Sequence, residues 1–432
     1  MANVLNFKCP SCGAKLTFNG EAGEMVCEYC DAHFTMEQAK AAEEAEAIDA
    51  ASSDMTWTTS QQAMITDEDG HVSGYLCPSC GAEMVAGDNT AATECPYCGN
   101  QAIIPQSFEG IYQPEVMVPF AIDKEKAKAS LQEFVKGKKL LPDSFTEGNR
   151  IEKITGLYVP FWLYSCHARG TVAFEGEKTS RRWEDSNFKY EKKDHYALNR
   201  SGEMDFNRIP ADASTQMDDA TMDSLEPYDL SAAVEFDAAY FSGYLADRYD
   251  VESKDAQSRA DERVKNTFIE KMKEKTSGYN SVTHKSESIR LENAKAEYAM
   301  LPVWMMTTKY EGESYTFGIN GQSGKMVGSL PIDKGKCTKY FILSSLISFV
   351  IIQIIIALLG LATALVEVIG IGIALLIGFF YLSSLKGAMN TIKTGTSAAS
   401  YLVDRSLQYD PPEDRFMYSR TEKTAKANNN NK

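Results

Sequence analysis

The sequence is short of positive charge. Its 432 residues hold 44 lysines and arginines against 60 aspartates and glutamates, so the net charge is −16. A general nucleic-acid-binding protein needs a basic surface that neutralises phosphates, and this balance argues against that class. The N-terminus also lacks a basic segment followed by an apolar one, so no cleaved signal peptide is expected.

A catalytic constellation is missing as well. Cys166 and His167 are adjacent, and neighbouring residues of a strand point to opposite faces, so they cannot act together as nucleophile and base. Cys166 is predicted to be a small buried residue instead. We therefore expect a protein that is not an enzyme. An enzyme with an unrecognised site between residues 107 and 335 is the remaining alternative.

The chain does contain a regular set of cysteines. Eight of its ten cysteines form four C-x-x-C pairs, and fourteen residues separate the two pairs of each set. The second set repeats the first at an offset of 68 residues, with nine of 22 positions identical, which indicates an internal duplication.

The spacing of these cysteines predicts two zinc ribbons. Zinc takes four thiolates in a tetrahedron, and two residues between cysteines let one turn aim both sulfurs at one ion. Glycine at positions 13, 81 and 99 suits the positive φ of such a turn, and Asp31 tolerates it. The predicted ligands are Cys9, Cys12, Cys27 and Cys30 for one ion and Cys77, Cys80, Cys95 and Cys98 for the other.

The predicted ribbons are expected to contact protein. Four protein ligands leave no open position on the metal for catalysis, so the ions are expected to be structural. Residues 75–105 contain no lysine or arginine, which is unlike a ribbon that grips nucleic acid. His33 and His71 lie nearby but are not needed as ligands, because both sets of four are complete.

The stretch Tyr340–Leu385 predicts a membrane anchor. It runs for 46 residues with one charged side chain, Glu367, and a spanning helix needs about 20 apolar residues. We therefore expect a helical hairpin that turns near Gly360. Lysines flank the hairpin on both sides and are absent from its turn, which places both termini in the cytoplasm. A buried hairpin of a soluble domain is the alternative.

Glu367 falls in the first turn of the second predicted span. A carboxylate at a helix N-terminus near the membrane surface is favoured by the helix dipole. A functional acid within the membrane is the other interpretation.

The region before the hairpin is predicted to be an α+β domain. Asp123 is a candidate N-cap for a helix to about Lys138, and a second helix is expected from about Lys254 to Lys275. The aromatic run 157–164 is echoed by 300–306, and Pro160 and Pro302 are expected at strand starts or edges. Residues 176–235 are polar and are predicted to form loops over the sheet.

The predicted organisation is a multidomain protein with two four-cysteine zinc ribbons, a soluble α+β domain and a transmembrane two-helix hairpin. Its parts are a first ribbon (1–34), an acidic helical and loop linker (35–74), a second ribbon (75–105), the α+β domain (106–335), the hairpin (340–385) and a flexible cytoplasmic tail (386–432). Within the tail, residues 416–418 are a candidate docking peptide, or else a segment that packs back on the domain.

These features resemble a known family. The C-P-x-C-G knuckles, the run Tyr158-Val-Pro-Phe-Trp-Leu, the segment Tyr240–Asp247 and the tail Asp414-Arg-Phe-Met-Tyr-Ser are similar to bacterial membrane-anchored TFIIB-type zinc-ribbon proteins of the YdjG type. The resemblance implies a link to the phage-shock envelope stress response, with PspA-like or flotillin-like (SPFH) proteins as partners.

The expected function is a membrane scaffold that recruits cytoplasmic proteins to the inner face of the cell membrane. Its expected partners are the lipid bilayer and these proteins, without nucleic acid, and homo-oligomerisation stays open. A membrane-tethered nucleic-acid-binding or transcription-related protein is the alternative.

Overall fold

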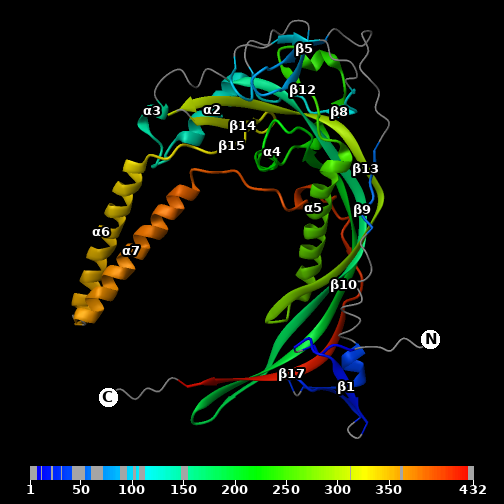
Figure 1. Ribbon diagram of the computed structural model, residues 1–432, viewed down its shortest axis with the longest axis vertical. Helices are drawn as coiled ribbons and strands as arrows, with labels where there is room; N and C mark the ends of the chain where they lie inside the picture. The colour runs from blue at the N-terminus through cyan, green and yellow to red at the C-terminus, as the bar shows by residue number, and fades with distance from the viewer. Residues whose placement is uncertain are drawn as a thin grey trace.

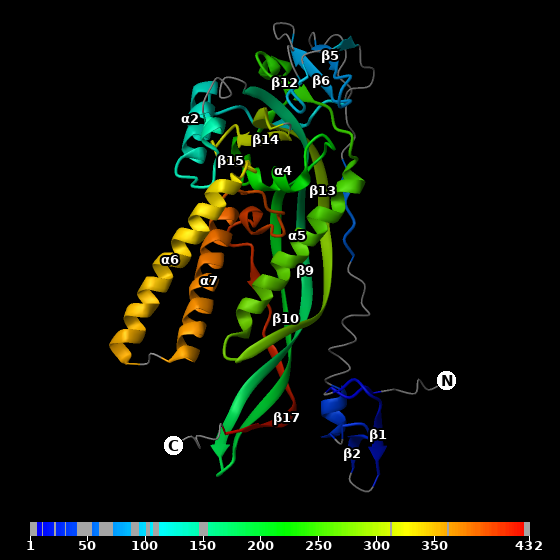
Figure 2. The same cartoon turned by 60° about the vertical axis from the view of Figure 1, so that its left-hand side comes forward.

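The fold was examined in a computed structural model (Figure 1). It describes residues 7–10, 12–20, 23–30, 32–40, 54–59, 72–87, 95–100, 104–106, 112–146, 154–311, 313–360 and 363–426. Within these residues, fourteen strands join into one sheet and a three-stranded sheet lies apart from it. Figures 1 and 2 show a body from which a long curved arm of strands and a pair of helices extend to the same side.

The bounds of the elements are as follows. The helices are α2 (Lys124–Val135), α3 (Asp143–Thr146), α4 (Asp219–Leu225), α5 (Ser253–Lys273), α6 (Lys334–Leu359) and α7 (Ala364–Gly387). The strands of the small sheet are β1 (Leu16–Asn19), β2 (Glu24–Cys27) and β3 (His33–Phe34). The strands of the large sheet are β4 (Thr58–Thr59), β5 (Val72–Leu76), β6 (Glu83–Gly87), β7 (Ile104–Gln106), β8 (Val116–Met117), β9 (Thr155–Glu184), β10 (Phe188–Asp212), β11 (Val234–Glu235), β12 (Leu245–Asp247), β13 (Ser281–Tyr310), β14 (Glu313–Asn320), β15 (Met326–Gly328), β16 (Gln408–Tyr409) and β17 (Glu413–Ala425).

Three long strands form the arm. β9 and β13 have 30 residues each and β10 has 25, whereas strands usually have about 3 to 10. They pair antiparallel in the order β10-β9-β13. The register shifts near Arg208 and Asn293, two residues with positive φ, and such bulges bend and twist a sheet.

The two similar aromatic runs are partners in this sheet. Leu301 of β13 lies opposite Val159 of β9, so the two runs pair with each other. Both prolines lie inside long strands, not at strand starts. Each stands just beyond the end of the neighbouring strand, because β10 ends opposite Phe161 and β14 ends opposite Val303. The missing N–H groups of the two prolines therefore interrupt no strand pairing with β10 or β14.

Two predicted helices are present. Asp123 caps α2 by accepting a hydrogen bond from the Lys126 backbone N–H at 2.8 Å. Helix α5 covers one face of the sheet, as Figure 2 shows. Its buried side chains include an apolar stripe of Ala256, Ala260, Val264, Phe268 and Met272. In the linker predicted to be helical and loop-like, residues 36–40 are helical, and residues 41–53 lie outside the described residues.

The prediction of loops over residues 176–235 is wrong. These residues include the tip of β9, all of β10 and α4. Near the tip both faces of the strands are exposed, so apolar alternation is absent from the sequence. Cross-strand pairs of opposite charge join the strands instead, among them Arg182 with Glu191 at 2.8 Å and Lys193 with Glu177 at 3.8 Å.

The prediction of a flexible tail is also wrong for the residues up to Ala425. β17 pairs with β10 from Glu413 to Ala425 and becomes part of the arm. Met417 is buried, and the Tyr418 ring meets the Phe34 ring of the small sheet at 5.7 Å between centroids. The candidate docking peptide therefore packs within the chain, and its backbone hydrogen bonds to β10 explain why it is ordered.

Helices α6 and α7 form the predicted hairpin. α6 ends at Gly360, whose φ of 65° makes it a left-handed C-cap. The buried residues of α7 are Gly370, Ala374 and Gly378, a spacing of four that lets the two backbones approach closely. Most other apolar side chains of the pair are exposed. Their length and hydropathy are sufficient to cross a membrane.

The structure gives Glu367 a partner. The Gln353 side-chain amide of α6 donates a hydrogen bond of 2.6 Å to the Glu367 carboxylate of α7. The bond joins the two helices close to their turn, so this acid has a structural role in the hairpin.

The base of the hairpin is fixed to the body. α6 begins at Lys334, earlier than the apolar run, and Lys336 binds the Leu141 carbonyl and the Asp143 carboxylate, both at 2.6 Å. The chain that leaves α7 returns to α5, where Arg263 binds the Ser397 carbonyl at 3.2 Å. Arg263 also forms a buried ion pair with Glu226, which accepts a further hydrogen bond of 2.8 Å from the Tyr401 hydroxyl.

The Arg263–Glu226 pair should be essential for stability. We expect Arg263→Ala to lower the free energy of unfolding by about 3 to 5 kcal/mol, because the substitution leaves Glu226 buried without its cation. Urea unfolding of the purified chain, followed by tryptophan fluorescence, measures this loss. Arg182→Ala, which breaks an exposed pair on the arm, is the control and should change stability far less. Equal effects of the two substitutions would contradict this role.

Candidate metal centres

The eight predicted ligands meet in two groups of four. The groups are Cys9, Cys12, Cys27 and Cys30, and Cys77, Cys80, Cys95 and Cys98, and within each group all sulfurs lie within 4.8 Å of one another. Sulfur pairs in each group lie 3.5 to 3.6 Å apart. A disulfide requires about 2.05 Å, and all these cysteines are free. Four sulfurs about 2.3 Å from one tetrahedral ion would be about 3.8 Å apart, so each group can hold a metal ion.

The knuckle turns aim their amides at the sulfurs. Gly13, Gly81 and Gly99 have φ between 68° and 77°, as predicted, and Asp31 lies outside the described residues. In the second site the Cys77 backbone N–H binds the Ala82 carbonyl at 2.9 Å, which closes the turn. Burial raises the pKa of Cys77, but the backbone N–H groups of Cys80 and Ser79 outweigh it and lower the pKa to about 7. The turn thus favours a thiolate, the form that binds a metal.

The first site shows the same preference. The backbone N–H of Cys30, followed by other donors, lowers the pKa of Cys27 to about 7. In the second site, burial raises the pKa of Cys80 to about 11 and that of Cys95 still further. A metal ion would remove the protons that burial otherwise holds on these sulfurs.

The two sites differ in their surroundings. The first has its own small core, in which Phe7, Leu16 and Phe34 pack around the cysteines. The second shares the main core, because β6 pairs with β12 of the large sheet. Ribbon 2 is therefore part of the body, and the boundary predicted at residue 106 does not separate two packed units.

One duplicated tyrosine shows this difference clearly. Tyr29 and Tyr97 occupy equivalent positions in the second knuckle of each site. Tyr29 is 83% exposed, whereas Tyr97 is 8% exposed and donates a hydrogen bond of 2.5 Å to Asp247. Ser214 donates another to the same carboxylate at 2.7 Å. Sequence reasoning missed Asp247 as the link between ribbon and body, although it ends the aromatic segment Tyr240–Asp247.

The other candidate residues do not form a reactive site. Cys166 is buried, and burial raises the pKa of its thiol to about 12, which leaves it protonated. His33 is exposed and lies 3.3 Å from Glu24. His71 lies outside the described residues.

Comparison with known proteins adds one relative. A Bacillus subtilis (strain 168) protein described as "Uncharacterized protein YdjG" is 30% identical over 338 residues, which is 78% of this chain and 93% of the relative. No protein-family model matches the chain. No solved structure matches it either.

The purified chain should carry two metal ions. We expect Cys12→Ser and Cys80→Ser each to remove about one ion, because each change leaves three thiolates of four. Elemental analysis measures the loss, and Cys166→Ser is the matched control that should keep both ions. A metal-free chain with oxidised cysteines would contradict the assignment.

Proposed function

The chain belongs to the same family as Bacillus subtilis YdjG, and we propose that it is a membrane-anchored scaffold. It would recruit cytoplasmic proteins to the inner face of the cell membrane. The observation that carries the proposal is the hairpin. Its apolar side chains stay exposed over two helices, while its base is fixed to a folded body that bears two tetracysteine sites.

Zinc is the proposed metal of both sites. All-thiolate tetrahedral sites suit zinc, and four protein ligands leave no position for a substrate. The residues present fit this role, since each sulfur set is closed and the knuckle amides favour thiolates. The zinc ions would hold the ribbons in shape, and protein surfaces would do the binding.

The bilayer is the proposed environment of α6 and α7. The residues exposed along both helices are mainly isoleucine, leucine, valine and phenylalanine, as in a membrane span. Lys334, Lys336, Lys339 and Lys386 surround the base, so the positive-inside rule puts the body and both termini in the cytoplasm.

This placement requires a change of angle between arm and hairpin. Figures 1 and 2 show both extending from the body to the same side. The arm tip is exposed and charged, and charged strands do not enter the hydrocarbon of a bilayer. The proposed topology therefore requires a wider angle between arm and hairpin in the membrane than Figures 1 and 2 show.

Ribbon 1 is the proposed partner-binding module. Its own core makes it a separate unit at the arm, and Tyr29 is exposed where the equivalent Tyr97 contacts the body. Exposed tyrosines are frequent anchors of protein interfaces. Tethering at the membrane raises the effective concentration for a second contact, so a weak ribbon contact can support capture. The family resemblance makes PspA-like and flotillin-like proteins the first partners to test.

The negative net charge disfavours the alternative function, a membrane-tethered nucleic-acid-binding protein. Phosphate contacts would have to overcome repulsion from a chain of net charge −16. Sub-micromolar binding of DNA or RNA at physiological salt would favour that alternative.

Labelling of intact cells tests the topology. We introduce cysteine at Thr363, next to the hairpin turn, and separately at Ser186, at the arm tip, in a chain with Cys337→Ala. A membrane-impermeant maleimide should label the first from outside and label the second only after lysis. External labelling of Ser186→Cys, or protection of Thr363→Cys, would contradict the arrangement.

Recruitment is tested with variants that separate anchor from ribbon. A chain without residues 334–387 should become soluble, and an unrelated two-helix anchor in their place should restore recruitment. Tyr29→Ser should keep the metal and the membrane location. It should weaken partner binding, and so raise the ratio of unbound to membrane-bound partner, by at least about ten-fold, since interface anchors contribute about 2 kcal/mol or more. Glu28→Gln is the control. Unchanged location of every cytoplasmic protein in cells lacking the chain would contradict the scaffold.

A further inference from the structure

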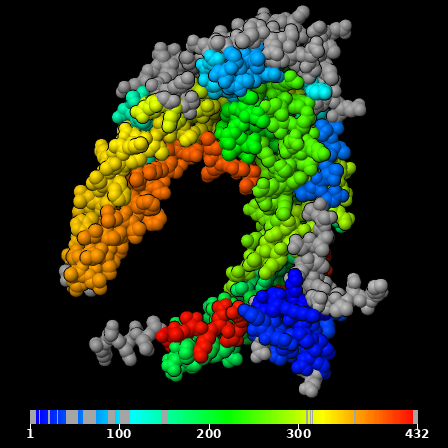
Figure 3. Space-filling view, viewed as in Figure 1, coloured from blue at the N-terminus to red at the C-terminus, as the bar shows by residue number. Residues whose placement is uncertain are grey.

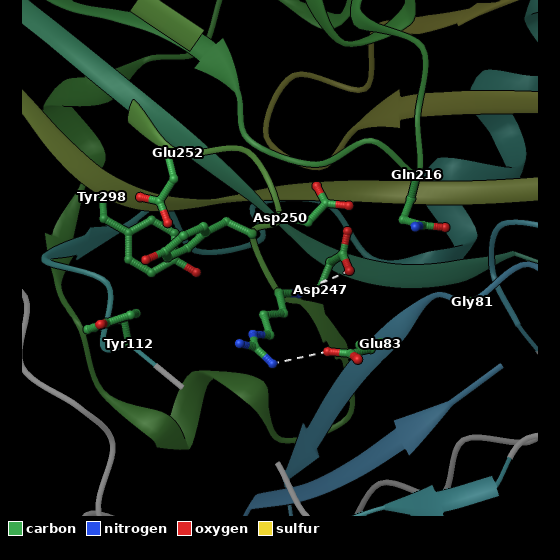
Figure 4. A pocket seen from close by; sticks show the side chains of 10 residues that line it. Gly81, Glu83, Tyr112, Gln216, Asp247, Asp250, Glu252 and Tyr298 are labelled. Carbon is green, nitrogen blue, oxygen red and sulfur yellow. Dashed lines mark hydrogen bonds and ion pairs between the residues drawn. The ribbon is translucent and has the colours of Figure 1, made fainter. Parts of the chain in front are cut away.

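A polar cavity lies where ribbon 2 meets the body. Its volume is about 450 Å³, and Figure 4 shows the side chains that line it. Gly81 and Glu83 come from ribbon 2, and the remaining walls come from the segments before β8, after β10 and after β12, and from β13. It borders the second metal centre through Gly81, the residue after Cys80, and the scaffold role does not use it.

Aromatic rings form one wall of the cavity. Tyr112 and Tyr249 stack with their centroids 6.0 Å apart, and Tyr298 meets Tyr249 edge-on at 5.1 Å. Trp162 supports both inner rings from behind, at 5.4 Å from Tyr249 and 5.5 Å from Tyr298. These contacts hold the rings in fixed positions at the cavity wall, and the π-face of a tyrosine attracts a cation.

Carboxylates surround these rings. Arg248 is the one basic residue of the lining, and Glu83 already pairs with it at 3.1 Å. The Glu252 carboxylate lies beside the tyrosines in Figure 4, makes no cap bond to α5 and has no partner among the described residues. Asp250 adds a second charge, held in place by the Thr215 backbone N–H at 2.7 Å. The lining therefore carries surplus negative charge.

An unpaired hydroxyl at the cavity wall completes the arrangement. Tyr298 is 2% exposed and lines the cavity, and its hydroxyl has no hydrogen-bond partner among the described residues. This oxygen reaches the cavity without a partner in the described chain, so it is available to accept a hydrogen bond from a ligand held there. A quaternary ammonium group has no N–H to donate, whereas a primary ammonium group has three.

We propose that this cavity binds a primary alkylammonium group, with the charge between the tyrosine rings and Glu252 and one N–H donated to the Tyr298 oxygen. Such a group is carried by lysine side chains and by free polyamines. Because ribbon 2 supplies one wall, the folded second metal centre would shape the site.

Calorimetric titration of the zinc-loaded full chain in detergent tests the site. The probes are N-acetyl-lysine N-methylamide, its ε-acetylated form, spermidine and tetramethylammonium. We expect the lysine derivative or spermidine to bind with a dissociation constant of about 1 mM or tighter. The acetylated form and tetramethylammonium should bind at least about ten-fold more weakly. Tighter binding of spermidine would identify a free polyamine, and tighter binding of the lysine derivative a side chain of a protein.

Conservative variants locate the binding. Tyr298→Phe keeps the ring and should weaken binding about ten-fold, because it removes the acceptor of a charged hydrogen bond. Glu252→Gln should weaken it by about five-fold or more. Glu262→Gln, the same charge change at an exposed position further along α5, is the control. Metal content checks the fold.

Three results would overturn the proposal. They are no binding of either amine, binding that neither Tyr298→Phe nor Glu252→Gln changes, and equal binding of tetramethylammonium. Each leaves the scaffold role untouched, since recruitment is measured in cells with Tyr29 and anchor variants. Loss of recruitment with intact amine binding would contradict only the scaffold.

Discussion

The antiparallel ladder between β9 and β13 positions every other part of the molecule. It runs from Ser281 opposite Glu177 to Met305 opposite Thr155. The outer edge of β13 carries β8 and β14, and through β14 the elements that hold the base of the hairpin. The outer edge of β9 carries β10 with the tail, and β12 with ribbon 2. Since the paired strands satisfy each other's backbone hydrogen-bonding groups, residues 156–166 can be buried on both faces. One ladder can therefore connect the hairpin base, β8, the tail and ribbon 2.

Features that depend on residues close together in the sequence could be predicted from it. The cysteine spacing predicted both tetracysteine groups, and the length of the apolar run predicted the hairpin and its turn at Gly360. The arm was missed because strand pairing between distant segments determines it, and its solvated tip carries charged cross-strand pairs such as Arg182 with Glu191 instead of apolar alternation. The ordered tail was missed for the same reason. Its thirteen-residue strand β17 is rich in charged and polar residues, which protect an edge from aggregation and also resemble the composition of a flexible segment.

The two copies of the duplicated cysteine motif lie in different surroundings. Both keep the four sulfurs and the closing turns, so each group has the geometry to hold a metal ion. The residues around the sulfurs make different contacts in the two copies. Tyr97 hydrogen bonds to the buried Asp247, and burial raises the pKa of this carboxyl to about 7. Tyr29, which has no such partner within the described part of the chain, is exposed. A ribbon that is built into the body can shape a cavity there, while a ribbon with its own core keeps its surface available for another protein.

In the proposed arrangement, charge explains why the hairpin is needed. The inner leaflet of a bacterial membrane is negatively charged, and a protein of net charge −16 is repelled by it. Surface attraction therefore cannot hold this body at the membrane, and the apolar helices must supply the attachment. The lysines at their base are partly used within the protein, since Lys336 binds Asp143 and the Leu141 carbonyl. They fix the hairpin to the body while the acidic surface keeps the body off the headgroups. Ribbon 2, on the body, would then face the cytoplasm, whereas ribbon 1 lies at the end of the arm (Figure 3) and would do so once the arm points away from the bilayer.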